Sequence, residues 1–192
     1  MTTFKLPNHL LTLEEWDDLP EEGYRWAELA EGVLQVSPSP AMKHQLASSE
    51  LLLALGPTAR VAGFRVVTDM DVLVDPVFPA TVRRPDLSIV DLSIVELSSA
   101  DPERLVARNV VLAVEIVSPG SGHRDRVTKL SEYAKAGISN YWILDIAGPA
   151  AVLDVFELDG QAYRRVQHAD GGTVVITAPF TVAIDVDALL TR

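Results

Sequence analysis

The stretch that decides the fold is residues 110–146, VVLAVEIVSPGSGHRDRVTKLSEYAKAGISNYWILDI. It opens with an apolar run that holds one glutamate, Glu115, and such a short continuous run indicates a central strand buried on both faces. Ser118-Pro119-Gly120 ends this strand, and a helix from about Arg124 to Ala136 follows, with Gly137 as a left-handed C-cap. NYWILDI then indicates a second buried strand. The stretch predicts a strand–helix–strand unit with parallel strands.

The segments before this unit predict one hairpin, two helices and two strands. Thr12 and Glu15 have the spacing of a capping box at the start of a short helix. YRWAEL and VLQVS, separated by Ala30-Glu31-Gly32, predict a hairpin. Ser39-Pro40 resembles an N-cap and a first-turn proline, so a helix is expected through MKHQLASSELLLAL, stopping before Gly56-Pro57. The strand candidates that follow are FRVVTDMDVLV and RRPDLSIV.

The segments after the unit are β-rich. VLDVFELDGQAYRRVQ predicts a hairpin that turns at Asp159-Gly160. FTVAIDVDALL predicts a strand that leads into a last helical turn. Together these elements predict one α/β (α+β) domain over residues 1–192, with a mixed central β-sheet flanked by helices and an N-terminal hairpin.

Composition and charge limit the possible functions. The chain has 192 residues and no cysteine, which excludes disulfides and thiolate metal sites. No apolar run is long enough to span a bilayer, and the N-terminus lacks a signal-peptide core, so a cytoplasmic protein without a membrane partner is expected. The net charge of −11 argues against a protein that coats nucleic acid, but leaves room for a local cationic cleft. Arg83-Arg84 and Arg124-Arg126-Lys129 are either such a cleft or solvated ends of elements.

Glu115 needs a compensating partner, because an unpaired carboxylate inside an apolar strand costs several kcal/mol. A basic group among Arg124, Arg126 and Lys129 is one possibility. The other is a metal shared with Asp86, which begins a strand that could lie beside Glu115. The second copy of DLSIV offers Asp91, which would point to the opposite face and lie about 16 Å further along. Carboxylates without cysteine suit Mg²⁺ or Mn²⁺, although such residues at strand ends are often only caps or ion-pair partners.

Four segments together resemble a known family over nearly the whole chain: WAELAEGVLQVSPSPAMKHQ, RRPDLSIV, AVEIVSPGSGHRDRVTKLSEYAKAGISNYWILD and VFELDGQAYRRV. They are similar to the Uma2 family, a large bacterial group of restriction endonuclease-like proteins. The resemblance implies the PD-(D/E)xK nuclease fold. It also implies a Mg²⁺-dependent hydrolase (or one using Mn²⁺) that cleaves phosphodiester bonds of nucleic acid, with DNA favoured.

The resemblance also implies roles for individual residues. Asp86 and Glu115 match the metal-binding carboxylates, and Glu28 matches an additional one in the N-terminal hairpin. Val117 stands where the family pattern usually has its lysine, and Lys129 on the next helix takes that role, positioning water. Asp125 and Tyr133, four residues to either side of Lys129, should share its helix face.

Further residues have weaker roles under the same resemblance. His44 and Asp125 stand at the family's usual places and support the centre, with His44 as a proton relay or a phosphate contact. Arg124 and Arg126 could contact a phosphate backbone. Without the resemblance, Glu28 indicates a surface residue, His44 a satisfied hydrogen-bond partner and Asp125 a first-turn acid that complements the helix dipole.

Two main classes of function stay open from the sequence. The first is a metal-dependent endonuclease whose catalytic residues are Asp86, Glu115, Lys129 and Glu28. The second is a catalytically inactive binding or assembly module that keeps the nuclease fold, which the acidic net charge favours. A hydrolase of another phosphate ester is a third, weaker class. A homodimer is a further expectation, since endonuclease-like folds that cut duplexes commonly pair two sites by symmetry.

Overall fold

The computed structural model describes residues 7–20, 24, 26–91, 93, 104–118 and 122–190. Its largest sheet has six strands in the order β11-β10-β9-β8-β6-β3, of which only β8 and β9 pair in parallel. The predicted strand–helix–strand unit is therefore confirmed. The strands are β3 (Phe64–Thr68), β6 (Leu87–Asp91), β8 (Val110–Val117), β9 (Asn140–Asp145), β10 (Val152–Asp159) and β11 (Ala162–Ala169).

A second sheet has five strands in the order β2-β1-β5-β4-β7, and β12 and β13 form a separate pair. The predicted N-terminal hairpin is β1 (Ala27–Ala30) and β2 (Val33–Val36). The remaining strands are β4 (Val72–Asp75), β5 (Thr81–Arg83), β7 (Leu105–Val106), β12 (Thr173–Ile176) and β13 (Val182–Asp185). The helices are α1 (Leu13–Asp17), α3 (Met42–Val61), η1 (Ala107–Asn109), η2 (Arg124–Lys129), α4 (Leu130–Lys135) and η3 (Asp187–Leu190).

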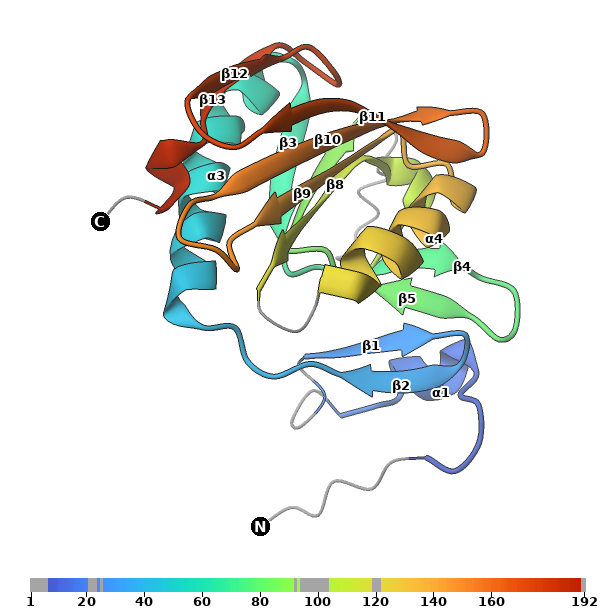
Figure 1. Cartoon of the computed structure of the whole chain (residues 1–192). Coiled ribbons are helices and arrows are strands. Elements are labelled where there is room, and N and C mark those ends of the chain that lie inside the picture. The colour runs from blue at the N-terminus through green and yellow to red at the C-terminus, as the bar shows by residue number, and fades with distance from the viewer. Residues whose placement is uncertain are drawn as a thin grey trace.

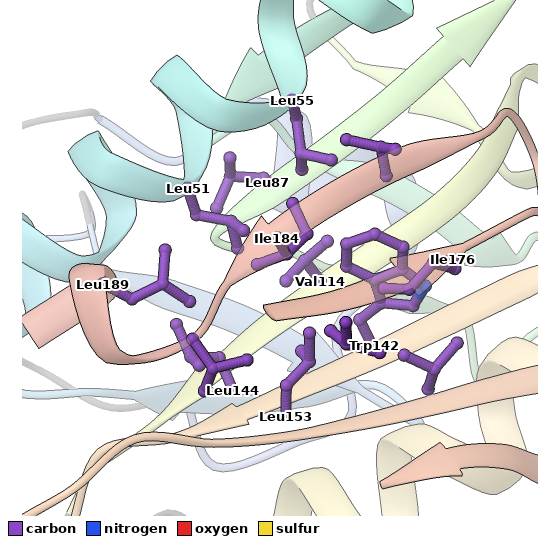
Figure 2. Close-up of a cluster of buried hydrophobic side chains, with 14 of the residues drawn as sticks. Leu51, Leu55, Leu87, Val114, Trp142, Leu144, Leu153, Ile176, Ile184 and Leu189 are labelled. Carbon is purple, nitrogen blue, oxygen red and sulfur yellow. The ribbon is translucent and has the colours of Figure 1, made fainter. Parts of the chain in front are cut away.

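The long helix α3 covers one face of the six-stranded sheet (Figure 1). Its buried residues recur every fourth position, at Ala47, Leu51, Leu55 and Ala59. Figure 2 shows Leu51 and Leu55 beside Leu87, among side chains of the sheet and of the β12–β13 pair. This face therefore holds the main hydrophobic core.

The predicted ends of α3 are wrong. The N-cap is Ala41, not Ser39, and the helix runs through Pro57 to Val61. Proline removes one intrahelical hydrogen bond, but Leu55 and Ala59 are fully buried against the sheet on either side of it. Burial of this stripe keeps the chain helical where the local signal predicts a stop.

Two predicted strands are each divided between the two sheets. FRVVTDMDVLV becomes β3 and β4, with Asp69 between them in the left-handed region at φ 51°. RRPDLSIV becomes the end of β5 and all of β6 except its last residue, Asp91. The capping box at Thr12 and the hairpin turn with Gly160 at φ 67° are confirmed. Pro119 and Gly120, expected to end β8, lie outside the described residues.

The opposite face of the six-stranded sheet is covered by η2 and α4 (Figure 1). The predicted helix over 124–136 begins with a π-helical turn, η2, and ends at Gly137 with φ 81°. The Tyr141 hydroxyl on β9 donates to the main-chain oxygen of Asp125 at 2.9 Å and fixes this turn to the sheet. In the described part of the chain, no helix is long and apolar enough to cross a membrane.

Candidate active site

Glu115 lies in the middle of β8 and faces η2 and α4, with 4% of its surface exposed. The Tyr133 hydroxyl donates a hydrogen bond of 2.7 Å to its Oε1, and the Lys129 ammonium lies 2.9 Å from the same atom. Burial raises the pKa of Glu115 above its usual range, and the Lys129 charge offsets this rise only in part. The carboxylate is held rigidly by a central strand and by two side chains of the helix above it.

Lys129 is the hub of the site. Its Nζ lies 2.9 Å from Glu28 Oε1, 2.9 Å from Glu115 Oε1 and 3.7 Å from Asp125 Oδ1. Burial by itself would lower the pKa of Lys129, but the three carboxylates outweigh burial and raise it. Lys129 is therefore a buried ammonium that its three carboxylate neighbours hold in the charged form. The π turn of η2 places Asp125 and Lys129 together, as the sequence predicted for positions i and i+4, and π turns occur frequently at functional sites.

Glu28 enters from the other sheet, on β1, so the centre joins the two sheets. It accepts from the Arg84 main-chain N–H at 3.0 Å and pairs with Arg83 Nη1 at 3.2 Å. Burial raises the pKa of Glu28, but Lys129 and Arg83 outweigh burial and bring it below its usual range. Glu28 is thus a buried carboxylate held ionised by two cations, and the interpretation as a surface residue is wrong.

Arg83 is 1% exposed, so the interpretation of the Arg83-Arg84 pair as a solvated strand end is wrong for its first member. Its Nε and Nη2 each donate 2.7 Å hydrogen bonds to the two oxygens of Glu132 on α4. This two-pronged contact, with the pairing to Glu28, ties β5 and β1 to the helix that carries Lys129. Glu132 was not predicted, and Arg83 was expected only in a cationic cleft or at a solvated strand end, because nothing in the local pattern distinguishes either residue from surface charges.

Asp86 lies just before β6, the strand that pairs with β8, as predicted. Its Oδ2 accepts from the Ile116 main-chain N–H at 2.6 Å, and its Oδ1 lies 3.2 Å from Nε2 of His44 on α3. The Asp86 carboxylate thus borders Glu115 along β8 and is more exposed, with 18% of its side chain accessible. Asp91 lies at the far end of β6, paired with Phe64 on β3, and belongs to no part of the centre.

The contact between His44 and Asp86 makes the charge of the His44 imidazole testable. Burial lowers the pKa of His44, but the Asp86 carboxylate outweighs burial and the pKa is raised. The ion pair therefore stabilises the folded protein fully at pH values below the pKa of His44 in the unfolded chain, about 6.5. This stabilisation is lost as pH rises through the higher pKa that His44 has in the folded protein.

We expect the free energy of unfolding of wild type to exceed that of His44→Gln by most at pH below about 6.5 and by progressively less above it. Urea denaturation of both proteins across that range measures the difference. A difference that stays constant with pH would show that Asp86 does not hold a charged imidazole.

The two arginines expected to contact a phosphate backbone lie outside the carboxylate centre. Arg124 Nη1 is 3.4 Å from the Ser37 hydroxyl, just after β2. Arg126 points along the sheet, with Nη2 at 2.8 Å from Asp145 and Nη1 at 2.9 Å from Asp154. Neither contacts Glu115 in the structure. Lys129 is thus the compensating cation among the three that the sequence offered.

Tyr133 has a larger part in the centre than the sequence indicated. It was predicted to share the helix face of Lys129, and it is fully buried on that face. Its hydroxyl, however, is the hydrogen-bond donor that orients Glu115. The edge-on ring of Tyr141, 5.3 Å away between centroids, packs Tyr133 in place. The i+4 spacing from Lys129 is the signal that could have identified it.

The carboxylates have the chemistry for a hard cation but not the arrangement. Oxygen donors such as those of Glu28, Asp86 and Glu115 are what Mg²⁺ prefers. Within the described ranges, however, no group of three His, Cys, Asp or Glu side chains is placed to hold a metal ion. The Lys129 ammonium lies between Glu28 and Glu115, and Asp86 is turned to the Ile116 main chain. The centre as folded therefore does not fit a divalent cation unless Lys129 moves.

Comparison with known proteins gives one family and one fold. The model of the family Uma2, described as "Putative restriction endonuclease", matches residues 13–187. No match is found among curated proteins. A crystal structure of "a putative nuclease belonging to DUF820" from Anabaena variabilis ATCC 29413 superposes with a TM-score of 0.71 at 19% identity, over 94% of this chain and 97% of that chain. The likeness confirms the predicted mixed α+β, restriction endonuclease-like fold.

Proposed function

The chain belongs to the Uma2 family, and on this basis we propose that it is a nuclease that hydrolyses phosphodiester bonds of nucleic acid, with DNA favoured. The proposed catalytic residues are Glu115, Lys129, Glu28 and Asp86. The observation that carries the proposal is the buried lysine within 2.9 Å of two carboxylates from different sheets. Apolar residues in these positions would often be equally stable or more so. A charged centre retained at such a place favours a chemical role.

Each residue has a role that its surroundings support. The Lys129 ammonium positions the attacking water and stabilises negative charge that develops on the phosphate. Glu115, fixed by Tyr133, and Glu28, fixed by Arg83, hold that ammonium in one place. His44 contacts and supports Asp86, and Asp125 contacts and supports Lys129. Preorganisation of this kind is how fixed charges accelerate a reaction.

Restriction endonuclease-like families typically depend on a divalent metal, and we propose Mg²⁺ or Mn²⁺, with Asp86, Glu115 and Glu28 as its ligands. Such an ion could bind there only if Lys129 left the space between Glu28 and Glu115, and it would then supply Lewis-acid stabilisation of the phosphate oxygens. Since the described carboxylates do not converge on one point while Lys129 lies between them, the roles above concern this chain's own residues only.

A second candidate function is a binding or assembly module that has kept the fold. The net charge of −11 favours it. A homodimer remains a prediction under either function, by analogy with endonucleases that place one site on each strand of a duplex.

The test is a cleavage assay on a panel of substrates: supercoiled plasmid, linear duplex, single-stranded DNA and RNA. We expect cleavage of DNA in Mg²⁺ or Mn²⁺ and none when the metals are chelated. Circular dichroism of the same preparation confirms that the protein is folded. Failure of the folded protein to cleave any substrate with either metal would contradict a nuclease and favour the binding module.

A further inference from the structure

A second cluster of charges lies on the same face of the sheet and is not used by the proposed centre. It consists of Arg126, Arg165 and His168 around the carboxylate of Asp154, and is called the basic cluster below. Asp154 is 3% exposed. Its Oδ2 lies 2.9 Å from Arg126, and its Oδ1 lies 3.2 Å from Arg165 and 2.7 Å from His168. One buried anion thus orients three basic side chains.

The basic side chains of the cluster face outward while its central anion does not. The side chains of Arg126, Arg165 and His168 are 36%, 56% and 50% exposed, against 4% for Asp154. Burial raises the pKa of Asp154, but the hydrogen bonds from His168 and Arg126 outweigh burial and lower it. The surface that a ligand would meet therefore presents the guanidinium groups of Arg126 and Arg165 and the His168 ring, although Asp145 also pairs with Arg126.

The register of the sheet places the basic cluster beside the proposed centre. Glu115 pairs with Ile143, Ile143 pairs with Asp154, and Asp154 pairs with His168. Directly paired residues point to the same face, so Glu115 and Asp154 lie in one row two strands apart, at about 10 Å. The turn η2 spans this distance, since it contributes Lys129 to the centre and Arg126 to the cluster.

Holding the fold together does not explain the whole cluster. Arg126 does join η2 to β9 and β10. Arg165 and His168, however, lie on β11, whose main chain already pairs with β10 along its length. Half-exposed ion pairs of this kind add little to stability. A guanidinium oriented by a carboxylate and open to solvent is instead well suited to bind phosphate oxygens.

We propose that the basic cluster binds backbone phosphate of a nucleic acid whose scissile bond lies at Glu115. Successive phosphates of one strand are spaced about 3.4 Å along the helix axis, so the cluster would hold a phosphate within about three nucleotides of that bond. This inference rests on the proposed function. It also accounts for how a chain with net charge −11 can engage a polyanion, through local contacts in place of bulk charge.

The test compares Arg165→Ala with Arg164→Ala. Arg164 is the neighbouring residue on β11, and its side chain is 63% exposed. In the register of the sheet, Arg164 lies opposite Glu157 on β10 and Arg165 lies opposite Phe156. Successive strand residues point to opposite faces. Both variants thus remove one positive charge, from opposite faces of the sheet. Affinity for fluorescent duplex DNA, single-stranded DNA and RNA is measured by anisotropy over a range of salt concentrations, with EDTA and separately with Ca²⁺.

We expect Arg165→Ala to weaken binding about three- to tenfold at about 100 mM salt and to reduce the slope of log affinity against log salt by about one. Arg164→Ala should change both much less. Equal effects of the two variants, no effect of Arg165→Ala, or no binding of wild type in either buffer would overturn the inference. If the protein cleaves nucleic acid but Arg165→Ala does not weaken binding, only the phosphate-binding role of the basic cluster is refuted. Binding that depends on Arg165, without cleavage, would refute only the nuclease.

Discussion

Replacing Lys129 with methionine is expected to lower the free energy of unfolding by about 3–5 kcal/mol, the usual loss when one partner of a buried ion pair is removed. Methionine keeps the length of the side chain but leaves Glu28, Glu115 and Asp125 without the ammonium that lies within 2.9 to 3.7 Å of them. Urea denaturation measures the loss. The same variant is expected to lose cleavage by about 100-fold or more, because it lacks the charge that we propose stabilises the phosphate.

Divalent cations are expected to restore part of that stability. With the ammonium removed, the carboxylates of Glu28 and Glu115 become available to Mn²⁺, and a cation that binds only the folded state stabilises it. Wild type should gain less from the same Mn²⁺ concentration, since Lys129 already occupies the space. Lys43→Met is the matched control, because Lys43 donates to the main-chain oxygens of Ile146 and Gly148 and contacts no carboxylate of the centre. A Mn²⁺ response of equal size in all three proteins would contradict this account.

Replacing Glu115 with glutamine is expected to reduce cleavage by about 100-fold or more while the protein stays folded. The amide oxygen can still accept from the Tyr133 hydroxyl, and Lys129 keeps Glu28 as a partner. The loss in free energy of unfolding should therefore be modest, about 1–3 kcal/mol. Metal binding, followed by calorimetric titration of Mg²⁺ or Mn²⁺, should weaken in the same variant.

Glu132→Gln is the control for that substitution. Glu132 belongs to the same network through Arg83, but it contacts neither Lys129 nor Glu115. The control should lose stability and keep most of the cleavage rate. Similar losses of cleavage in both variants would indicate that the network supports the fold and not the chemistry.

The central unit of the fold follows from local sequence signals, and other parts do not. The apolar run around Glu115 and the left-handed Gly137 fix β8 and the end of α4 almost by themselves. The path of α3 through Pro57 depends instead on Leu55 and Ala59 meeting a distant sheet. The division of FRVVTDMDVLV between two sheets depends on which strands pair with each half. The residues of the segment alone do not determine which strands pair with it.

The site shows the same limit. The closeness of Asp86 to Glu115 was predicted from two strands expected to be neighbours, and the hydrogen bond to the Ile116 main chain agrees with it. Glu28 could be placed at the centre only through the family resemblance, since β1 belongs to the other sheet. The part of Arg83 could not be predicted, because its partners Glu28 and Glu132 are 55 and 49 residues away. Ion pairs across such separations appear only once the chain is folded.

The most direct test of the proposed centre is the Mn²⁺-dependent cleavage of one labelled DNA duplex by wild type and Glu115→Gln, purified in the same way and both confirmed as folded. We expect cleavage by wild type and a rate lower by about 100-fold or more for the variant. Equal rates would place the activity elsewhere in the preparation. Absence of cleavage by folded wild type would contradict a catalytic role for Glu115 and Lys129.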